Sequence, residues 1–291
     1  MKYYLTTLIG FCIVTNVAIS QANQPKIFHI TSAHTAFPDT GRANGHLYDS
    51  VLYDAATHYS DSSVLIMVSP QFSAGKNIDM VFWFHGWRNN IDSADVRYSL
   101  SKQFFASGRN AVLVLAETAK DAPDSYGGKL EQPGVFDLLL NDVMNELKQQ
   151  KIVSNKTTIG NVTLAGHSGA YRVIAYALQN STQKVHSVFL FDALYAETDK
   201  FMNWIKLDPG NIFINWYTNH GGGTDEVSKD MMESLQKEAI PFTSTEEDSL
   251  TVGQLKRNRI VFVHSLREHN DIINDPDNFQ LLLQATGDKH K

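Results

Sequence analysis

Two uninterrupted runs of apolar residues constrain the fold of this chain more than any other feature of its sequence. Val-Leu-Val-Leu occupies positions 112–115, and Val-Phe-Leu-Phe occupies positions 188–191. Short runs rich in β-branched and aromatic residues favour strands, and the lack of alternation with polar residues indicates that both faces of each strand are covered. Such strands are typical of a parallel sheet that lies between two layers of helices.

Strand-like runs recur along the chain after residue 25, and segments with helical periodicity separate them. Strands are expected over residues 26–31, 64–69, 80–84, 111–116, 161–165, 187–191, 212–217 and 259–263. Helices are expected over residues 94–107, 136–147, 171–178, 198–205, 226–237 and 277–285. The alternation predicts an α/β fold with a mostly parallel, doubly wound sheet of about eight strands flanked by helices. Ligands bind such sheets at the carboxyl ends of the strands.

Length and composition are those of an ordinary globular protein. A chain of 291 residues can form one α/β domain with a full core, so we expect residues 23–291 to be a single domain. Lys+Arg number 25 against Asp+Glu 31, which gives a net charge of −6, and the basic residues form no cluster. Because nucleic acids are bound by clustered basic side chains, this balance excludes a nucleic-acid partner.

Residues 1–22 have the pattern of a removable signal peptide, with Lys2, a mostly apolar run and then small residues. We expect cleavage after Ser20 or Ala22 and a secreted or periplasmic product. The run falls short of the roughly 20 apolar residues of a membrane helix, so no integral span is expected after cleavage. The only cysteine, Cys12, leaves with this segment. The mature chain then has no disulfide, thiolate metal site or cysteine nucleophile.

A serine lies between small residues where an apolar strand meets a helix. The sequence Gly166-His167-Ser168-Gly169-Ala170 follows Val162-Thr163-Leu164-Ala165 and precedes an apolar helical segment. A tight strand-to-helix turn needs small neighbours and presents its central side chain clear of the backbone. The pattern therefore indicates Ser168 as a nucleophile, and a serine hydroxyl needs a base, an acid that orients the base, and donors for an oxyanion.

Two histidines after the last strand are candidates for the base. A catalytic imidazole must reach the serine from a loop beyond the strand, which favours His269 over His264 at the strand edge. Two aspartates are candidates for the acid. Asp192 directly follows the strand over residues 187–191, where a buried carboxylate would need a partner, and it is preferred to Asp225, which could equally cap the next helix.

The strand over residues 80–84 ends in His85-Gly86-Trp87, where a glycine lets backbone N–H groups face a pocket. We expect one oxyanion donor to be the N–H of Gly169, at the start of the helix after Ser168. The second would be the N–H of Trp87 or of its neighbour Gly86.

These features resemble the α/β-hydrolase superfamily over about residues 60–285. The resemblance rests on the turn at Ser168, the His-Gly-Trp strand end, and the chain order Ser168, Asp192, His269. Within that superfamily the arrangement is similar to that of pancreatic-type lipases. The resemblance implies an exported serine hydrolase of the esterase or lipase type, which cleaves small-molecule or lipid esters through a Ser-His-Asp triad and an acyl-enzyme without a cofactor.

The segment over residues 117–134 is expected to border the pocket, and four aromatic residues are candidates for its lining. They are Trp87, Tyr126, Tyr195 and Trp216.

Three alternatives remain at this stage. An amidase or peptidase would use the same triad, and an exported binding protein could carry a degenerate site. Metal-dependent hydrolysis has little support, because the chain contains no His-Glu-x-x-His pattern and the segment Glu268-His269-Asn270-Asp271 alone lacks a ligand set. We therefore expect no metal, and the sequence predicts no particular oligomeric state.

Overall fold

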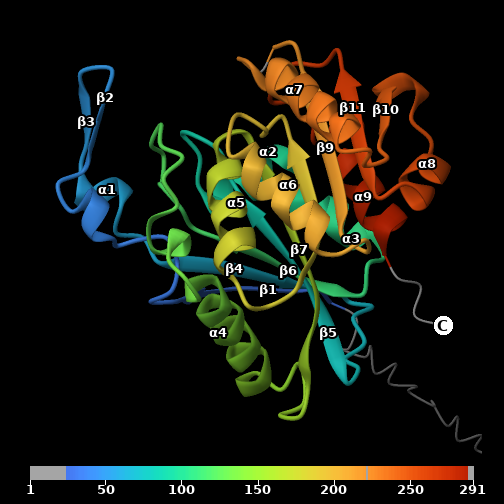
Figure 1. The fold of residues 1–291 in the computed structure, drawn as a ribbon. Coiled ribbons are helices and arrows are strands. Elements are labelled where there is room, and N and C mark those ends of the chain that lie inside the picture. The colour runs from blue at the N-terminus through green and yellow to red at the C-terminus, as the bar shows by residue number, and fades with distance from the viewer. Residues whose placement is uncertain (1–23, 221, 288–291) are drawn as a thin grey trace, which may run out of the picture.

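The structure is a computed structural model that describes residues 24–220 and 222–287. The predicted signal peptide lies outside these residues. One sheet of nine strands is formed within them, in the order β1-β4-β6-β5-β7-β8-β9-β11-β10 (Figure 1). The strands are β1 (Lys26–Thr31), β4 (Ser63–Val68), β5 (Asn77–Phe84), β6 (Ala111–Ala116), β7 (Thr158–His167), β8 (Val185–Phe191), β9 (Ile212–Thr218), β10 (Thr243–Glu246) and β11 (Ile260–Ser265).

Neighbouring strands from β6 to β10 are parallel, whereas β4 is antiparallel to both β6 and β1. The predicted α/β fold with a mostly parallel sheet is confirmed. The sheet has one strand more than the eight expected, because β10 has the short polar sequence Thr-Ser-Thr-Glu at an edge. Backbone hydrogen bonds to one neighbour hold a strand at the edge of a sheet, so such a strand needs no apolar face.

Helices cover both faces of the sheet (Figure 1). Those packed in one core are α4 (Val135–Gln149), α5 (Tyr171–Asn180), α6 (Thr198–Leu207) and α7 (Thr224–Lys237). Those packed in the other are α2 (Ile91–Tyr98), α3 (Leu100–Ser107), α8 (Val252–Arg257) and α9 (Asn278–Thr286). Along β6, Val112 and Val114 enter the first core while Leu113 and Leu115 enter the second. This two-sided burial explains why the strand is apolar at every position.

The prediction of a single helix over residues 94–107 is wrong, because Ser99 divides this segment into two helices. Ser99 ends α2 and begins α3 with a φ of 51°, in the left-handed region. The amide of Ser101 donates to the side chain of Asp95 at 2.7 Å. A short polar side chain that binds a nearby amide competes with the helical hydrogen bonds, which accounts for the break.

Between β1 and β4, the chain forms a small hairpin. The hairpin consists of β2 (His46–Tyr48) and β3 (Val51–Tyr53) and is followed by α1 (Ala55–His58). Figure 1 shows this hairpin, in blue, standing clear of the helical layers. The 3-10 turns are η2 (Thr40–Arg42), η3 (Gly128–Glu131), η4 (Ser168–Ala170) and η5 (Glu247–Ser249). None of the helices described here is long and apolar enough to span a membrane.

Candidate active site

Ser168 lies at the carboxyl end of β7, where the strand turns into η4 and α5. Its φ is 55°, in the left-handed region that residues other than glycine seldom adopt. A backbone held in this region costs roughly 1–3 kcal/mol, which the surrounding packing must offset. The serine therefore stands on the tight strand-to-helix turn that the sequence predicts.

The glycines beside Ser168 allow close packing around this turn. A Cβ on Gly166 would lie 2.6 Å from the Cβ of Ala170, so strand and helix could not approach as they do. A Cβ on Gly169 would lie 2.6 Å from the indole of Trp87 and 2.8 Å from Oγ of Ser125. Real Cβ atoms do not come this close to other heavy atoms, so the small residue after Ser168 makes room for the Trp87 ring beside the serine.

Asp192 directly follows β8, the strand next to β7, and its side chain is fully buried. One carboxylate oxygen, Oδ2, lies 2.5 Å from Nδ1 of His269 and 3.2 Å from Oγ1 of Thr218. The other, Oδ1, accepts from the amide of Thr218 at 3.1 Å and from the hydroxyl of Thr224. Burial alone would raise the pKa of Asp192, but the bonds from His269 and Thr224 outweigh it, so the pKa lies below its usual range. Asp192 is therefore a stable anion.

His269 lies in the loop after β11, and its side chain is 23% exposed. A second histidine, His167, holds the backbone of this loop, because Nε2 of His167 lies 2.9 Å from the carbonyl oxygen of His269. The two rings pack with their centroids 4.4 Å apart. Burial, joined by the nearby charge of His269, lowers the pKa of His167 to about 3. His167 is therefore neutral, with the proton on Nε2, and Nδ1 can accept from the hydroxyl of Tyr98 at 3.2 Å.

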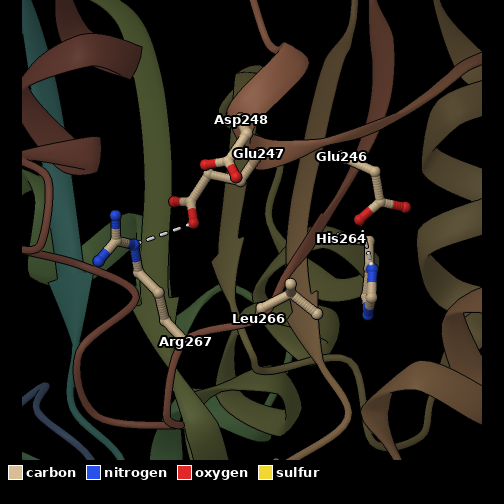
Figure 2. Close-up of a pocket in the computed structure, with 6 residues that line it drawn as sticks. All are labelled: Glu246, Glu247, Asp248, His264, Leu266 and Arg267. Atoms are coloured by element: carbon tan, nitrogen blue, oxygen red, sulfur yellow. Dashed lines mark hydrogen bonds and ion pairs between the residues drawn. The ribbon is translucent and has the colours of Figure 1, made fainter.

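The alternative base and acid lie elsewhere. His264 is on β11, and its ring nitrogens contact Glu246 at 2.7 Å and Asn219 at 3.1 Å. Figure 2 shows His264 beside Glu246, at a hollow bordered mainly by charged side chains. Asp225 lies in the first turn of α7 and contacts Lys229 at 3.3 Å, while Gly223 takes the capping position. The structure thus brings Asp192 together with His269 and leaves His264 and Asp225 with other partners.

A buried ion pair lies at the carboxyl end of β5. His85 and Glu117 have side chains only 1% exposed, and Nε2 of His85 lies 2.6 Å from Oε1 of Glu117. Burial by itself would lower the pKa of His85, but the carboxylate outweighs it and the pKa is raised. As an imidazolium, His85 donates from both nitrogens, and Nδ1 lies 2.8 Å from the carbonyl oxygen of Gly86. Glu117 also accepts from the amide of Ile91 at 3.3 Å.

This pair fixes a segment that passes directly over Ser168. A Cβ on Gly86 would lie 2.6 Å from the Cβ of Ser168, so only glycine fits there. The amide of Arg88 donates to the carbonyl of Ala122 at 2.9 Å, which occupies that donor within the loop. Trp87 stands between them, with its indole Nε1 donating to Ser125 at 2.7 Å. Of the expected oxyanion donors, Gly86 and Trp87 thus lie on a segment packed against the serine, and Gly169 follows the serine directly.

A pocket of about 310 Å³ opens at Ser168. Its lining residues are Trp87, Ser125, Ser168, Gly169, Tyr171, Tyr195 and Gly222. Burial raises the pKa of both Tyr171 and Tyr195, so their hydroxyls stay protonated and the wall is uncharged. Of the four aromatic residues expected to line the pocket, two do so. Trp216 is instead buried in the core, and Tyr126 lies under the guanidinium of Arg42, 4.7 Å from its ring centre.

Sequence reasoning missed the residues that support this site. Glu117 follows β6 as directly as Asp192 follows β8, so its place at a strand end was a usable signal. Thr218 ends β9 in the same way, whereas the role of Thr224 depends on where α7 packs. Among the described residues, no group of three or more histidine, cysteine or acidic side chains is arranged to hold a metal ion.

Comparison with known proteins finds similarity in structure alone. No family model matches the sequence, and no curated protein is similar to it. A ferulic acid esterase is similar over 90% of this chain and 98% of its own, with a TM-score of 0.58 and 10% identity. A mutant feruloyl esterase module from Clostridium thermocellum, in complex with sinapinate, has a TM-score of 0.51 at 10% identity and covers 100% and 99% of the two chains.

A third solved structure is the substrate-bound fluorophosphonate-binding serine hydrolase F of Staphylococcus aureus. It covers 90% of this chain and 99% of its own, with a TM-score of 0.50 and 11% identity. All three are serine hydrolases or esterases by name, and each covers at least 90% of this chain. The chain therefore has the fold of the α/β-hydrolase superfamily.

Proposed function

We propose that this chain is a serine hydrolase that cleaves carboxylic esters, with Ser168 as nucleophile, His269 as base and Asp192 as the acid that orients the base. The observation that carries the proposal is the 2.5 Å contact between His269 and Asp192, two residues far apart in the sequence, at the sheet edge where Ser168 stands on a strained turn. The ferulic and feruloyl esterases of the same fold support an ester as the substrate.

The reaction follows from the protonation states of these groups. Asp192 holds Nδ1–H of His269, so Nε2 is the nitrogen that exchanges protons. The oxygen of Ser168 attacks the ester carbonyl as its proton passes to Nε2, and the anion of Asp192 stabilises the imidazolium. The tetrahedral oxyanion accepts hydrogen bonds from the amides of Gly169 and Trp87. His269 then gives its proton to the leaving alcohol, and water releases the acyl group by the same steps in reverse.

The proposal is tested by the turnover of aryl acetates. Ser168→Ala and His269→Ala are expected to lower kcat by about 10³-fold or more, because the members of a triad act as a unit. His264→Ala is the matched control, because it removes a histidine from the end of β11, the strand that precedes the loop of His269. Its kcat is expected to stay within about twofold of the wild type. Turnover that persists in Ser168→Ala, or that is lost in His264→Ala and kept in His269→Ala, would contradict the assignment. Matching aryl anilides in the same assay separate an esterase from an amidase.

We also propose that the protein is exported, with residues 23–291 as one mature domain. The support is the pattern of residues 1–22, with a basic start, an apolar run and small residues at Ala18, Ser20 and Ala22. Amino-terminal sequencing of the protein from its native host tests this. Mature chains that begin at residue 21 or 23 are expected, and a chain that still begins at Met1 would contradict it.

A further inference from the structure

The hairpin of β2 and β3 carries exposed apolar side chains beside a two-residue turn. Its turn consists of Asp49 and Ser50, whose φ values of 49° and 63° are both positive, as in the two-residue turns that match the twist of a hairpin. Four apolar side chains next to this turn are exposed in the chain alone. They are Leu47 at 66%, Tyr48 at 36%, Val51 at 53% and Leu52 at 60%.

The register of the hairpin sorts these side chains onto two faces. Tyr48 pairs with Val51, and Leu47 pairs with Leu52. Since side chains on successive residues of a strand point to opposite faces, the Tyr48–Val51 pair and the Leu47–Leu52 pair lie on opposite sides. The ring of Tyr48 packs edge-on against Trp87, with centroids 5.2 Å apart and planes at 76°. The Tyr48–Val51 face is thus the one turned toward the active-site pocket.

Trp87 joins the hairpin to that pocket. Its indole lines the pocket beside Ser168, is 42% exposed and also packs against the ring of Tyr48. The pocket, at about 310 Å³, is at the small end of the range for ligand sites. An apolar group too long for the pocket can continue along Trp87 to Tyr48, which packs on its ring, and to Val51, which pairs with Tyr48.

The acid–base geometry decides which part of an ester follows this path. His269 must protonate the leaving alcohol, so the alcohol lies next to His269. The residues that line the described pocket do not include His269. We therefore assign the acyl group to this pocket, whose wall at Trp87 leads to Tyr48.

We propose that Tyr48 and Val51 form an outer acyl site, which binds the distal part of acyl chains too long for the pocket at Ser168. This inference rests on the proposed esterase activity and names the feature of the substrate that the hairpin selects. The burial of methylenes against Trp87, Tyr48 and Val51 favours longer acyl groups, since each buried methylene contributes about 0.8 kcal/mol in the general case. Acetyl esters do not reach the hairpin and gain nothing from it.

The test compares two double variants of the same hairpin. Tyr48→Thr with Val51→Thr removes the pocket-side pair, and Leu47→Thr with Leu52→Thr removes the pair on the other face. Threonine keeps the strand preference of the hairpin, and the melting temperature of each variant checks that the fold is retained. We would measure kcat/KM for p-nitrophenyl acetate, butyrate, octanoate and decanoate below the concentration at which each ester aggregates, and the turnover of the decanoate also above it.

The pocket-side variant is expected to lose about tenfold in kcat/KM for the decanoate and less than twofold for the acetate. The outer-face variant is expected to match the wild type at every chain length. Equal effects of the two variants, or no effect of either, would overturn the outer acyl site. An effect seen only with aggregated ester would assign the hairpin to a lipid surface, and one that follows a change in oligomeric state would assign it to a second copy of the chain; either overturns the proposal.

Acetate turnover in Ser168→Ala separates the two proposals. If this variant is inactive while the hairpin variants do not differ, the esterase assignment stands and the outer acyl site fails. If it keeps full turnover, the assignment of Ser168 fails, and the acyl site fails with it.

Discussion

Two buried histidines lie at the ends of neighbouring strands, and one is charged while the other is neutral. His85 ends β5 against Glu117, and its pKa is raised. His167 ends β7 against the carbonyl of His269 and the hydroxyl of Tyr98, and its pKa is lowered to about 3. Both rings are almost inaccessible to solvent. The difference between a carboxylate and neutral partners therefore decides whether a buried imidazole carries a proton.

The comparison also separates two kinds of support for the proposed chemistry. Charged His85 fixes the segment of Gly86 and Trp87, which carries one of the two proposed oxyanion donors. Neutral His167 fixes the loop of His269, the proposed base. A neutral ring suits the second position, because an imidazolium 4.4 Å from His269 would oppose the positive charge that His269 gains in the reaction.

The largest expected effect is on the charged pair. Glu117→Gln leaves His85 without its carboxylate in a site closed to water, so the free energy of unfolding is expected to fall by about 3 kcal/mol at pH 5.5. Urea titration measures it. The matched control is Glu246→Gln, beside the more exposed His264, for which a loss of at most about 1 kcal/mol is expected. Equal losses in the two variants would contradict the charged state of His85.

The same variant has a defined pH dependence. Because the pKa of His85 is raised on folding, the stability that it contributes is fully present below its unfolded pKa of about 6.5 and is lost as pH rises through the folded pKa. The difference between wild type and Glu117→Gln should therefore shrink from pH 6.5 upward. A difference that grows with pH would have the wrong sign.

A smaller effect, of opposite sign, is expected for His167. Its folded pKa of about 3 lies below the unfolded value of about 6.5, so the unfolded chain binds a proton between these limits and the folded chain does not. Relative to His167→Gln, the wild type is expected to lose about 2 kcal/mol of unfolding free energy between pH 7 and pH 5. Parallel stability curves for the two proteins would show that His167 is not held neutral.

The smallest expected effect is kinetic. His167→Ala removes the donor to the carbonyl of His269, so the base loses its fixed position and kcat for p-nitrophenyl acetate should fall about tenfold while KM stays within twofold. His167→Gln keeps an N–H at a similar reach and should restore most of kcat. Failure of glutamine to restore more than alanine would indicate that the ring packing, and not the hydrogen bond, matters.

Much of the fold could be predicted because strands buried on both faces carry their signal locally. The runs at 112–115 and 188–191 indicated a sheet between two helical layers without knowledge of their partners. The strand β10 and the break at Ser99 lacked such a signal, since the strand depends on an edge position and the break on a single hydrogen bond from the amide of Ser101 to the side chain of Asp95.

The candidate site divides in the same way. Ser168 and Asp192 each follow an apolar strand, so the rule that function lies at carboxyl ends of strands was enough to find them. His269 was preferred to His264 only because a catalytic imidazole must reach the serine from a loop beyond the strand. The strand-end place of Glu117 offered the same signal, whereas the support from Thr224 and the packing of the hairpin on Trp87 depend on contacts between segments far apart in the sequence, which no local pattern encodes.

The central claim is that Ser168 is an activated nucleophile, and covalent labelling tests it most directly. The protein would be treated with a fluorophosphonate and digested, and the modified peptide identified by mass spectrometry. The account predicts one adduct, on Ser168, formed much more slowly in His269→Ala and absent from Ser168→Ala. An adduct on another residue that persists in Ser168→Ala together with ester turnover would contradict it.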